Sequence, residues 1–332
     1  MTESSMKVEH LTKHYPIKTG FFRTLISKET PVVHAVDDAS FQIGAEEIFG
    51  LVGESGCGKT TTGKLLLRLI QPTSGKIYFQ DKDITNLTPQ QMRKMRQKIQ
   101  VIFQDPYESL NPRMSIYDII SEPVHVLKAA RSIEEIKDKV TKVMEDMGLI
   151  PPEEFLYRFP HELSGGQRQR VAIARAFILE PQFIVADEPV SMLDASIRSE
   201  VAKLILSLVG KFHISFLYIT HDIALSRYMC NRIAIMYLGK IVEMGPTDDV
   251  IQSPFHPYTE ALIAAVPVPD PTVKRTEIVL KGEIPSAVNP PSGCRFHTRC
   301  MYAQDTCKKE EPPLVETGKN RYLACYFPLG KE

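Results

Sequence analysis

Apolar and polar residues follow two different periods along the chain. Nearly all-apolar runs at 48–52, 183–186 and 214–219 are typical of parallel strands that are covered on both faces. Over 132–148 apolar residues recur at helical spacing, which predicts an amphipathic helix with one face packed on the core. These residues are Ile133, Ile136, Val140, Val143, Met144 and Met147. Because helices precede and follow the apolar strands, the pattern predicts an α/β fold with a mostly parallel sheet.

A strand, a glycine-rich turn and a helix follow one another between residues 46 and 70. The turn, "GESGCGKT" at 53–60, fits the pattern G-x-x-x-x-G-K-[ST]. Backbone N–H groups of such a loop point inward at phosphate oxygens, and the next helix adds its N-terminal partial charge. Lys59 can then reach the β- and γ-phosphates, and the Thr60 hydroxyl can hold Mg²⁺; alone, Lys59 would be read as a solvated lysine. The nucleotide-binding candidates are Gly53, Glu54, Ser55, Gly56, Cys57, Gly58, Lys59, Thr60 and Thr61.

A second apolar strand, "FIVADEP", ends in two acids, Asp187 and Glu188. Ligands of parallel sheets bind at the carboxyl edge of the strands. Asp187 is placed to hold Mg²⁺, directly or through water, and Glu188 is the candidate base that polarises the attacking water. Two solvated carboxylates at a strand end are the alternative interpretation.

The composition limits the class of protein. The 332 residues carry 40 basic and 40 acidic side chains, so the formal net charge is zero. A basic excess, the usual sign of nucleic-acid binding, is missing, and the low net charge favours association with protein partners. The N-terminus has no apolar core of signal-peptide type, and no apolar run reaches the roughly 20 residues that cross a bilayer. We therefore expect a cytosolic protein with reduced thiols.

The segment "LSGGQ" at 163–167 resembles the signature motif of ATP-binding cassette (ABC) proteins. Ser164, Gly165 and Gly166 open a helix, so they form a second N-terminal anion site. In the family this site, with Gln167, serves the γ-phosphate held by the opposite subunit. The resemblance therefore implies two cassettes that sandwich two ATP molecules, with closure completing the catalytic geometry.

Four further positions match motifs of that family in the family's order. Tyr15 in "KHYP" resembles the aromatic residue that stacks on adenine, and Gln104 in "VIFQDP" resembles the glutamine that senses Mg²⁺ and contacts the membrane partner. Asp194 in "SMLD" resembles the D-loop aspartate, and His221 in "ITHD" resembles the switch histidine beside the γ-phosphate. Alone, His221 would be read as a satisfied core histidine. The resemblance implies a P-loop ABC ATPase core with an antiparallel β-subdomain and a helical subdomain at about 105–165.

The distance between the phosphate loop and the signature motif bears on the class of ABC protein. It has room only for a compact helical subdomain, and the chain holds one cassette. ABC ATPases of translation and DNA repair usually carry a long insertion there or two cassettes. A transporter subunit is the favoured class, and those ATPases are the alternative.

The C-terminal region narrows the resemblance. "SPFHPYTEALIAAVP" and "GEIPSAVNPPSGCRFHTRC" resemble the extension of oligopeptide/dipeptide-type ABC importer ATPases. "GESGCGKTT" is closer to the second of the two ATPases that such importers pair. Thr298 departs from the family pattern, which usually has proline there. The resemblance implies a nucleotide-binding domain over 1–252 and an extension domain over 253–332.

The family also implies partners and a place in the cell. Its ATPases bind two transmembrane permease subunits, which receive the ligand from an extracytoplasmic substrate-binding protein. We expect this chain at the cytoplasmic face of a prokaryotic membrane as a peripheral subunit, paired with a different ATPase and with no nucleic acid. Peptides are the expected substrate, and oligosaccharides or small solutes such as nickel are the alternatives. A helical turn at 21–26 either packs locally or contacts the membrane partner.

Four of the six cysteines are clustered near the C-terminus. They are Cys294, Cys300, Cys307 and Cys325. A reducing compartment disfavours disulfides, and intervals of five, six and seventeen residues fit no close-pair zinc motif. The four match the family's iron–sulfur motif, so the resemblance implies a [4Fe–4S] cluster, with zinc and unligated thiols as alternatives. His297 is expected to be a neighbour of the cluster rather than a ligand. Cys57 is expected to be a tolerated small residue rather than a nucleophile, and Cys230 a buried hydrophobic residue.

Overall fold

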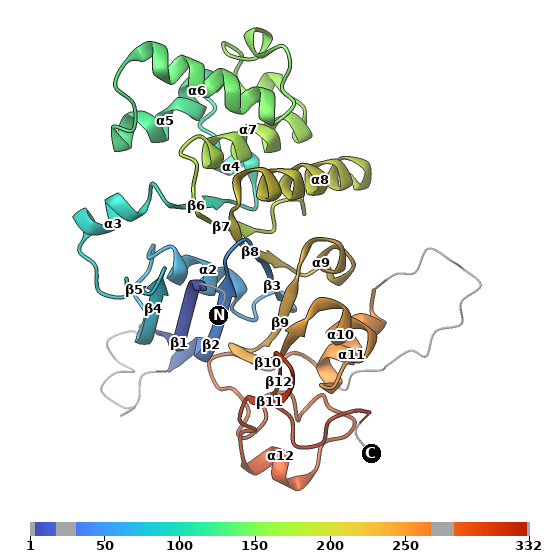
Figure 1. The fold of residues 1–332 in the computed structure, drawn as a ribbon. Coiled ribbons are helices and arrows are strands. Elements are labelled where there is room, and N and C mark those ends of the chain that lie inside the picture. The colour runs from blue at the N-terminus through green and yellow to red at the C-terminus, as the bar shows by residue number, and fades with distance from the viewer. Residues whose placement is uncertain (1–3, 18–30, 267–281, 331–332) are drawn as a thin grey trace. The chain divides into compact units, whose positions relative to one another are not determined.

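The computed structural model describes residues 4–17, 31–266 and 282–330 (Figure 1). The chain forms two compact units, each assembled from separate stretches of sequence. The signature unit contains residues 1–6, 43–48 and 79–218. The phosphate-loop unit contains residues 7–42, 49–78 and 219–332. The helical turn expected at 21–26 lies outside the described residues.

Most elements of the phosphate-loop unit are strands. The strands are β1 (Ser4–Pro16), β2 (Val32–Gly44), β3 (Ile48–Val52), β4 (Ser74–Phe79), β9 (Arg232–Tyr237), β10 (Lys240–Pro246), β11 (Val315–Gly318) and β12 (Arg321–Leu323). The helices are α2 (Lys59–Leu66), α9 (Ile223–Met229), α10 (Thr247–Gln252), α11 (Pro257–Ala264) and α12 (Asp305–Lys309). The strands order as β11-β12-β10-β9-β3 in one sheet and β2-β1-β4 in the other.

The strand β3 is the scaffold of the phosphate loop. All five of its residues are buried, and it runs parallel to β9 with Gly50 opposite Ile233. The strands β9 and β10 form an antiparallel hairpin, and β10 pairs antiparallel with β12 through Glu243 and Leu323. The C-terminal extension therefore continues this sheet with antiparallel strands, whereas β3, which carries the phosphate loop, is paired in parallel as predicted.

The signature unit is mainly helical. Its helices are α3 (Pro89–Met95), α4 (Pro106–Ser109), α5 (Ile116–Leu127), α6 (Ile133–Asp146), η1 (Pro152–Glu154), η2 (Pro160–Glu162), α7 (Gly165–Phe177) and α8 (Ala195–Phe212). Its strands are β5 (Lys82–Asp83), β6 (Ile99–Ile102), β7 (Phe183–Asp187) and β8 (Ser215–Thr220). The strands β6 and β7 are parallel, with Ile99 opposite Phe183. The helices α5, α6 and α7 pack against one another.

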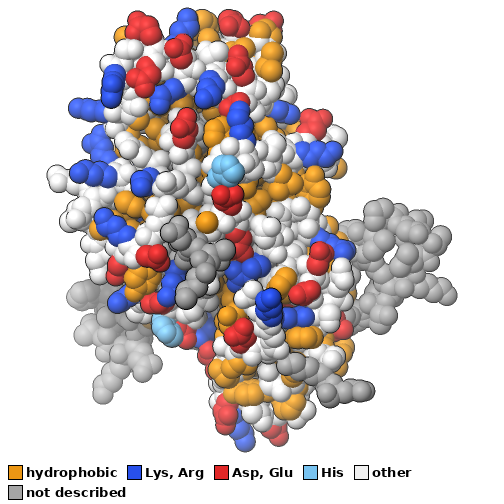
Figure 2. Space-filling model, viewed as in Figure 1, with side chains coloured by type: hydrophobic (Ala, Val, Ile, Leu, Met, Phe, Trp, Pro, Cys, Tyr) orange, Lys and Arg blue, Asp and Glu red, His pale blue; other side chains and the backbone are white. Residues whose placement is uncertain are grey.

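The amphipathic helix predicted at 132–148 is present as α6. Ser132 caps its N-terminus by accepting a hydrogen bond from the Glu135 N–H, and Ile136 and Val140 are buried. Ile133 was expected on the apolar face, but 74% of it is exposed, because it is the first residue of the helix and lies beyond the packed turn. Acidic and basic side chains are interspersed over the visible face of the signature unit (Figure 2).

Other predicted elements are also confirmed, with shorter bounds. The helix expected at 61–70 begins at Lys59 and ends at Leu66. The apolar run at 214–219 is the fully buried strand β8. No helix within the described ranges is both long enough and apolar enough to span a membrane. These elements form the combination of helices and strands that the pattern predicted for an α/β fold.

Candidate functional site

The phosphate loop joins β3 to α2 and depends on residues without a side chain. Gly58 has a φ of 111°, and a Cβ there would lie 2.2 Å from the Ala35 carbonyl oxygen. A Cβ at Gly53 would lie 2.2 Å from the Met236 carbonyl oxygen. Since a heavy atom cannot fit at that distance, both positions require glycine.

Lys59 is held inside this loop. The residue is 5% exposed, and its Nζ donates hydrogen bonds to the carbonyl oxygens of Gly53 at 2.8 Å and Glu54 at 2.9 Å. The solvated-lysine alternative is therefore wrong. Cys57 is 4% exposed, and burial raises the pKa of its thiol despite the nearby Lys59 charge. Cys57 is thus a buried neutral residue, as expected, rather than a nucleophile.

Two other predicted nucleotide contacts belong to the same unit. Tyr15, near the end of β1, is 37% exposed, and the Nζ of Lys13 lies 4.9 Å from its ring centroid. His221 directly follows the end of β8 and is exposed. The next residue, Asp222, caps α9 by accepting a hydrogen bond from the Leu225 N–H. A core position for His221 is therefore wrong. Its role in ATP hydrolysis stays a prediction.

The signature unit brings together Gln104 and Glu188, residues 84 positions apart. The side-chain amide of Gln104 donates a hydrogen bond of 3.1 Å to Glu188 Oε2. Asp187 ends β7, and both acids are half-buried, which argues against two freely solvated carboxylates. Glu188 has a φ of 47°, in the left-handed region that a residue with a Cβ seldom adopts. Such backbone strain is common at functional sites.

The signature motif opens the 13-residue helix α7. The Ser164 hydroxyl accepts a hydrogen bond from the Gln167 N–H at 3.3 Å, and Gln167 Oε1 accepts one from the Ser164 N–H at 3.0 Å. This is a capping box, and it places Gly165 and Gly166 in the first turn. A Cβ on Gly166 would lie 2.7 Å from Ile197 Cγ2, so this turn packs closely on α8. The predicted D-loop residue Asp194 is the exposed N-cap of the same helix α8.

The four C-terminal cysteines line one pocket in the phosphate-loop unit. Cys294, Cys300, Cys307 and Cys325 share it with His297 and aromatic side chains, including Phe296. None of the four is joined in a disulfide, and the Cys294 N–H donates to the Cys307 carbonyl oxygen at 2.8 Å. Burial raises the pKa of Cys294 to about 11 and of Cys325 to about 12, and thiolates at the neighbouring cysteines would add to the rise. A thiolate here therefore needs a cationic partner such as a metal.

The spacing of the sulfurs bears on which metal fits. All four cysteines lie within the described ranges, but no three of their sulfur atoms lie within 4.8 Å of one another. A single tetrahedral zinc, with bonds of about 2.3 Å, would hold its sulfurs about 3.8 Å apart. In this arrangement no three of the four sulfurs lie close enough together for a single zinc ion.

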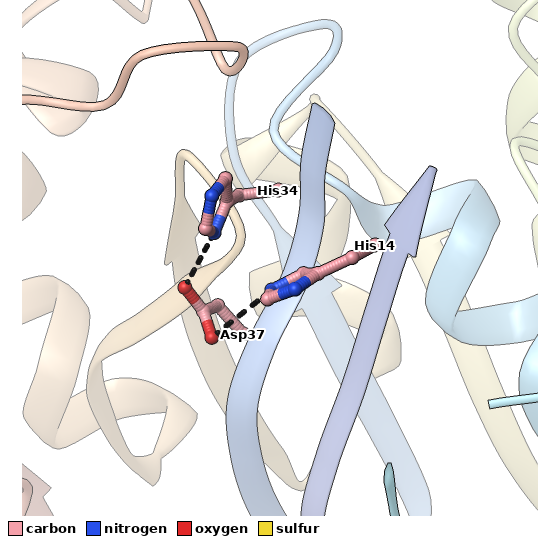
Figure 3. Close-up of side chains that lie close together, drawn as sticks. All are labelled: His14, His34 and Asp37. Atoms are coloured by element: carbon pink, nitrogen blue, oxygen red, sulfur yellow. Dashed lines mark hydrogen bonds and ion pairs between the residues drawn. The ribbon is translucent and has the colours of Figure 1, made fainter. Parts of the chain in front are cut away.

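A second cluster, which the sequence analysis missed, joins β1 and β2 (Figure 3). His14 Nε2 lies 3.4 Å from Asp37 Oδ1, and His34 Nδ1 lies 3.1 Å from Asp37 Oδ2. Burial opposes ionisation of Asp37, but the Arg295 charge and the His34 hydrogen bond outweigh it and lower its pKa. Two histidines and an aspartate could bridge a divalent cation. Because Arg295 already pairs with the Asp37 carboxylate, we interpret the cluster as a structural junction.

The C-terminal extension also contacts the phosphate loop, which the motifs did not predict. Arg299 donates two hydrogen bonds to the Glu54 carboxylate, at 2.8 and 3.2 Å. The Tyr258 hydroxyl accepts a bond of 3.0 Å from the Glu54 N–H. The only hint in the sequence is the pair of arginines within "CRFHTRC".

Comparisons with known proteins identify the family. A model described as "ABC transporter" matches residues 36–191, and one described as "Oligopeptide/dipeptide transporter, C-terminal region" matches residues 242–307. The "Probable peptide ABC transporter ATP-binding protein y4tS" of Sinorhizobium fredii is 48% identical over 98% of this chain and 90% of its own length. The "Oligopeptide transport ATP-binding protein AppF" of Bacillus subtilis is 43% identical over 98% of both chains.

Solved structures agree with this result. The cassette cbiO1 from Clostridium perfringens is 28% identical, with a TM-score of 0.64 over 75% of this chain and 91% of its own. A dimeric bacterial ABC transporter cassette is 28% identical, with a TM-score of 0.63 over 73% of this chain and 98% of its own. This chain belongs to the ATP-binding, ATP-hydrolysing subunits of oligopeptide/dipeptide-type ABC transporters.

Proposed function

We propose that this chain is the ATPase that powers a peptide importer. The observation that carries the proposal is similarity along 97–98% of the chain to subunits named for peptide or oligopeptide transport. The solved cassettes match only 73–75% of this chain, so the similarity to peptide transport subunits reaches beyond the part shared with them.

The residue roles follow from the motifs and are supported by the geometry within each unit. Lys59 neutralises the β- and γ-phosphates, and Thr60 and Asp187 hold Mg²⁺ with Gln104 as its sensor. Glu188 accepts the proton of the attacking water, and the Gln104 hydrogen bond orients its carboxylate. His221 donates to the γ-phosphate, and Tyr15 stacks on adenine.

The signature motif acts on a neighbouring cassette. The first turn of α7, with Ser164 to Gln167, presents backbone N–H groups to the γ-phosphate held by a different ATPase subunit, and Asp194 lies at the contact between the two. ATP-driven closure of this pair moves two permease subunits at the cytoplasmic face of the membrane, and an extracytoplasmic binding protein supplies the ligand. Residues 1–252 form the nucleotide-binding domain, and 253–332 form the extension.

The extension holds a [4Fe–4S] cluster on Cys294, Cys300, Cys307 and Cys325. Three observations support it: the thiols line one pocket, no disulfide joins them, and no three of their sulfurs lie within 4.8 Å of one another, as one zinc ion would require. A cluster would supply the positive charge that keeps buried thiolates deprotonated. His297 is a neighbour of the cluster, since its Nδ1 already lies 2.9 Å from the Cys294 carbonyl oxygen.

Uptake by cells that lack this subunit tests the transported substrate. Cells receive the wild-type chain, Lys59→Ala, or Lys64→Ala, a matched exposed lysine on the same helix. We expect the wild type and Lys64→Ala to restore uptake of labelled short peptides, and Lys59→Ala to fail because it loses its phosphate contacts. Normal peptide uptake in cells without the chain, together with lost oligosaccharide uptake, would overturn the peptide assignment.

A further inference from the structure

We propose that the extension positions the phosphate loop of its own chain. Arg299 holds the loop directly, and Arg295 holds the turn at 238–239 that is hydrogen-bonded to the loop. Both arginines lie between Cys294 and Cys300 in sequence, so that ligation of the flanking thiols sets the affinity for ATP. The inference rests on the proposed ATP and cluster sites, and it assigns Arg299 as a positioning residue.

The contact between Arg299 and Glu54 has the geometry of a strong ion pair. The guanidinium donates to both carboxylate oxygens, at 2.8 and 3.2 Å, and only 8% of the Arg299 side chain is exposed. A bidentate arginine fixes both the distance and the orientation of its partner. Glu54 is the second residue of the phosphate loop, so this contact holds the loop and not its surroundings.

A second contact holds the backbone at the same point. The Tyr258 hydroxyl accepts from the Glu54 N–H, and Tyr258 is fully buried. Its ring centroid lies 5.3 Å from that of Phe296, which directly follows Arg295 in the sequence. The Glu54 carbonyl oxygen in turn accepts from Lys59 Nζ. The path from Arg299 to the phosphate-binding lysine therefore has a single residue, Glu54, between them.

Arg295 reaches the loop indirectly, through the β9–β10 turn. It donates to the Leu238 carbonyl oxygen and to Asp37, the centre of the histidine cluster in Figure 3. The next residue, Gly239, donates from its N–H to the Cys57 carbonyl oxygen at 2.8 Å, and its own carbonyl oxygen accepts from the Asp37 N–H at 2.9 Å. The β9–β10 turn thus connects Arg295 to the middle of the phosphate loop.

These contacts couple the cysteine pocket to ATP binding. Cys294 directly precedes Arg295, and Cys300 directly follows Arg299. When the cysteines gain or lose their ligand and shift, both arginines move with them. The segment between the two cysteines is only five residues long, and its Phe296 packs against Tyr237. The loop then loses the fixed orientation of its N–H groups on which phosphate binding depends.

Binding of a fluorescent ATP analogue to the full chain tests the role of Arg299. The set comprises the wild type, Arg299→Ala, Arg299→Lys, Glu54→Gln and the double variant Arg299→Ala/Glu54→Gln. Lys308→Ala is the control, because Lys308 pairs with Asp305 on the exposed surface of the same extension. Circular dichroism and melting curves confirm that each variant is folded.

We expect Arg299→Ala to weaken binding by roughly tenfold, because a displaced loop forfeits part of several phosphate hydrogen bonds. Arg299→Lys should restore part of the affinity, since it keeps the charge but loses the bidentate geometry. The double variant should bind no worse than the weaker single variant. Unchanged affinity in a folded Arg299→Ala, or additive losses in the double variant, would overturn the inference.

The same measurement on anaerobically purified protein, before and after removal of iron with a chelator, tests the coupling. We expect iron loss to weaken ATP binding in the wild type and to add little in Arg299→Ala. Equal affinity of both wild-type forms would overturn the coupling. Failure of every form to bind ATP would instead reject the proposed ATP site, so the two failures are distinguishable.

Discussion

At the scale of single residues, ATP hydrolysis is expected to depend on the carboxylate of Glu188, the proposed base. Its carboxylate follows the buried end of β7, and Gln104 donates to it at 3.1 Å. A glutamine in its place would keep a similar shape and a hydrogen-bonding group but could not take a proton from water. A glutamine substitution therefore tests the basicity of this side chain separately from its position.

We predict that Glu188→Gln reduces ATP hydrolysis by at least about 100-fold and leaves ATP binding intact, because only the base is removed. Phosphate release at saturating ATP measures the first effect, and binding of a fluorescent ATP analogue measures the second. Glu180→Gln is the matched control, since Glu180 is an exposed glutamate in the same unit. Hydrolysis at the wild-type rate in Glu188→Gln would refute the role of base.

At the scale of elements, the sequence predicted local segments better than it predicted how they join. The apolar period of α6 and the buried run of β8 are both present. The return of the extension to the sheet as β12 was not predicted, because three residues of strand carry almost no periodic signal. Its anchor is the ion pair of Arg321 with the fully buried Glu243, which only packing could reveal.

We predict that the anaerobically purified chain contains four irons and four acid-labile sulfides, with visible absorption typical of a cluster. Iron, sulfide and zinc assays on one sample measure this. Cys294→Ser should lose the iron because it removes a ligand, whereas Cys230→Ala should keep it, since Cys230 is buried and does not line the pocket. Zinc in place of iron, or iron retained by Cys294→Ser, would contradict the cluster.

At the scale of the whole molecule, the two predicted phosphate-binding motifs belong to different compact units. The phosphate loop lies in one unit, and in the other the signature motif forms the capping box of α7. The family's solved members include a dimeric cassette. Under the proposed function, pairing with a second ATPase completes the site, so we expect this pairing to control ATP hydrolysis.

We predict that ATP with Mg²⁺ joins the Glu188→Gln chain to its companion ATPase, because unhydrolysed nucleotide is trapped between them. Light scattering after size-exclusion chromatography measures the mass with and without ATP. Gly165→Arg should abolish this association by blocking the first turn of α7, where a Cβ meets only Leu193, at 3.8 Å. Gly210→Arg, at an exposed position with open space, should not. Pairing that needs no ATP, or that survives Gly165→Arg, would argue against the sandwich.

The sequence by itself determined the fold class and the chemistry-bearing motifs. The phosphate loop, the signature turn and the strand-end acids each occupy a few consecutive residues, and their geometry depends on local backbone rules such as glycine at positive φ. Only the tertiary structure decided which distant side chains meet. Arg299 and Glu54 are 245 positions apart, and Arg295 and Asp37 are 258 apart. Such pairs leave no periodic trace, because packing of the whole unit, rather than any local preference, brings them together.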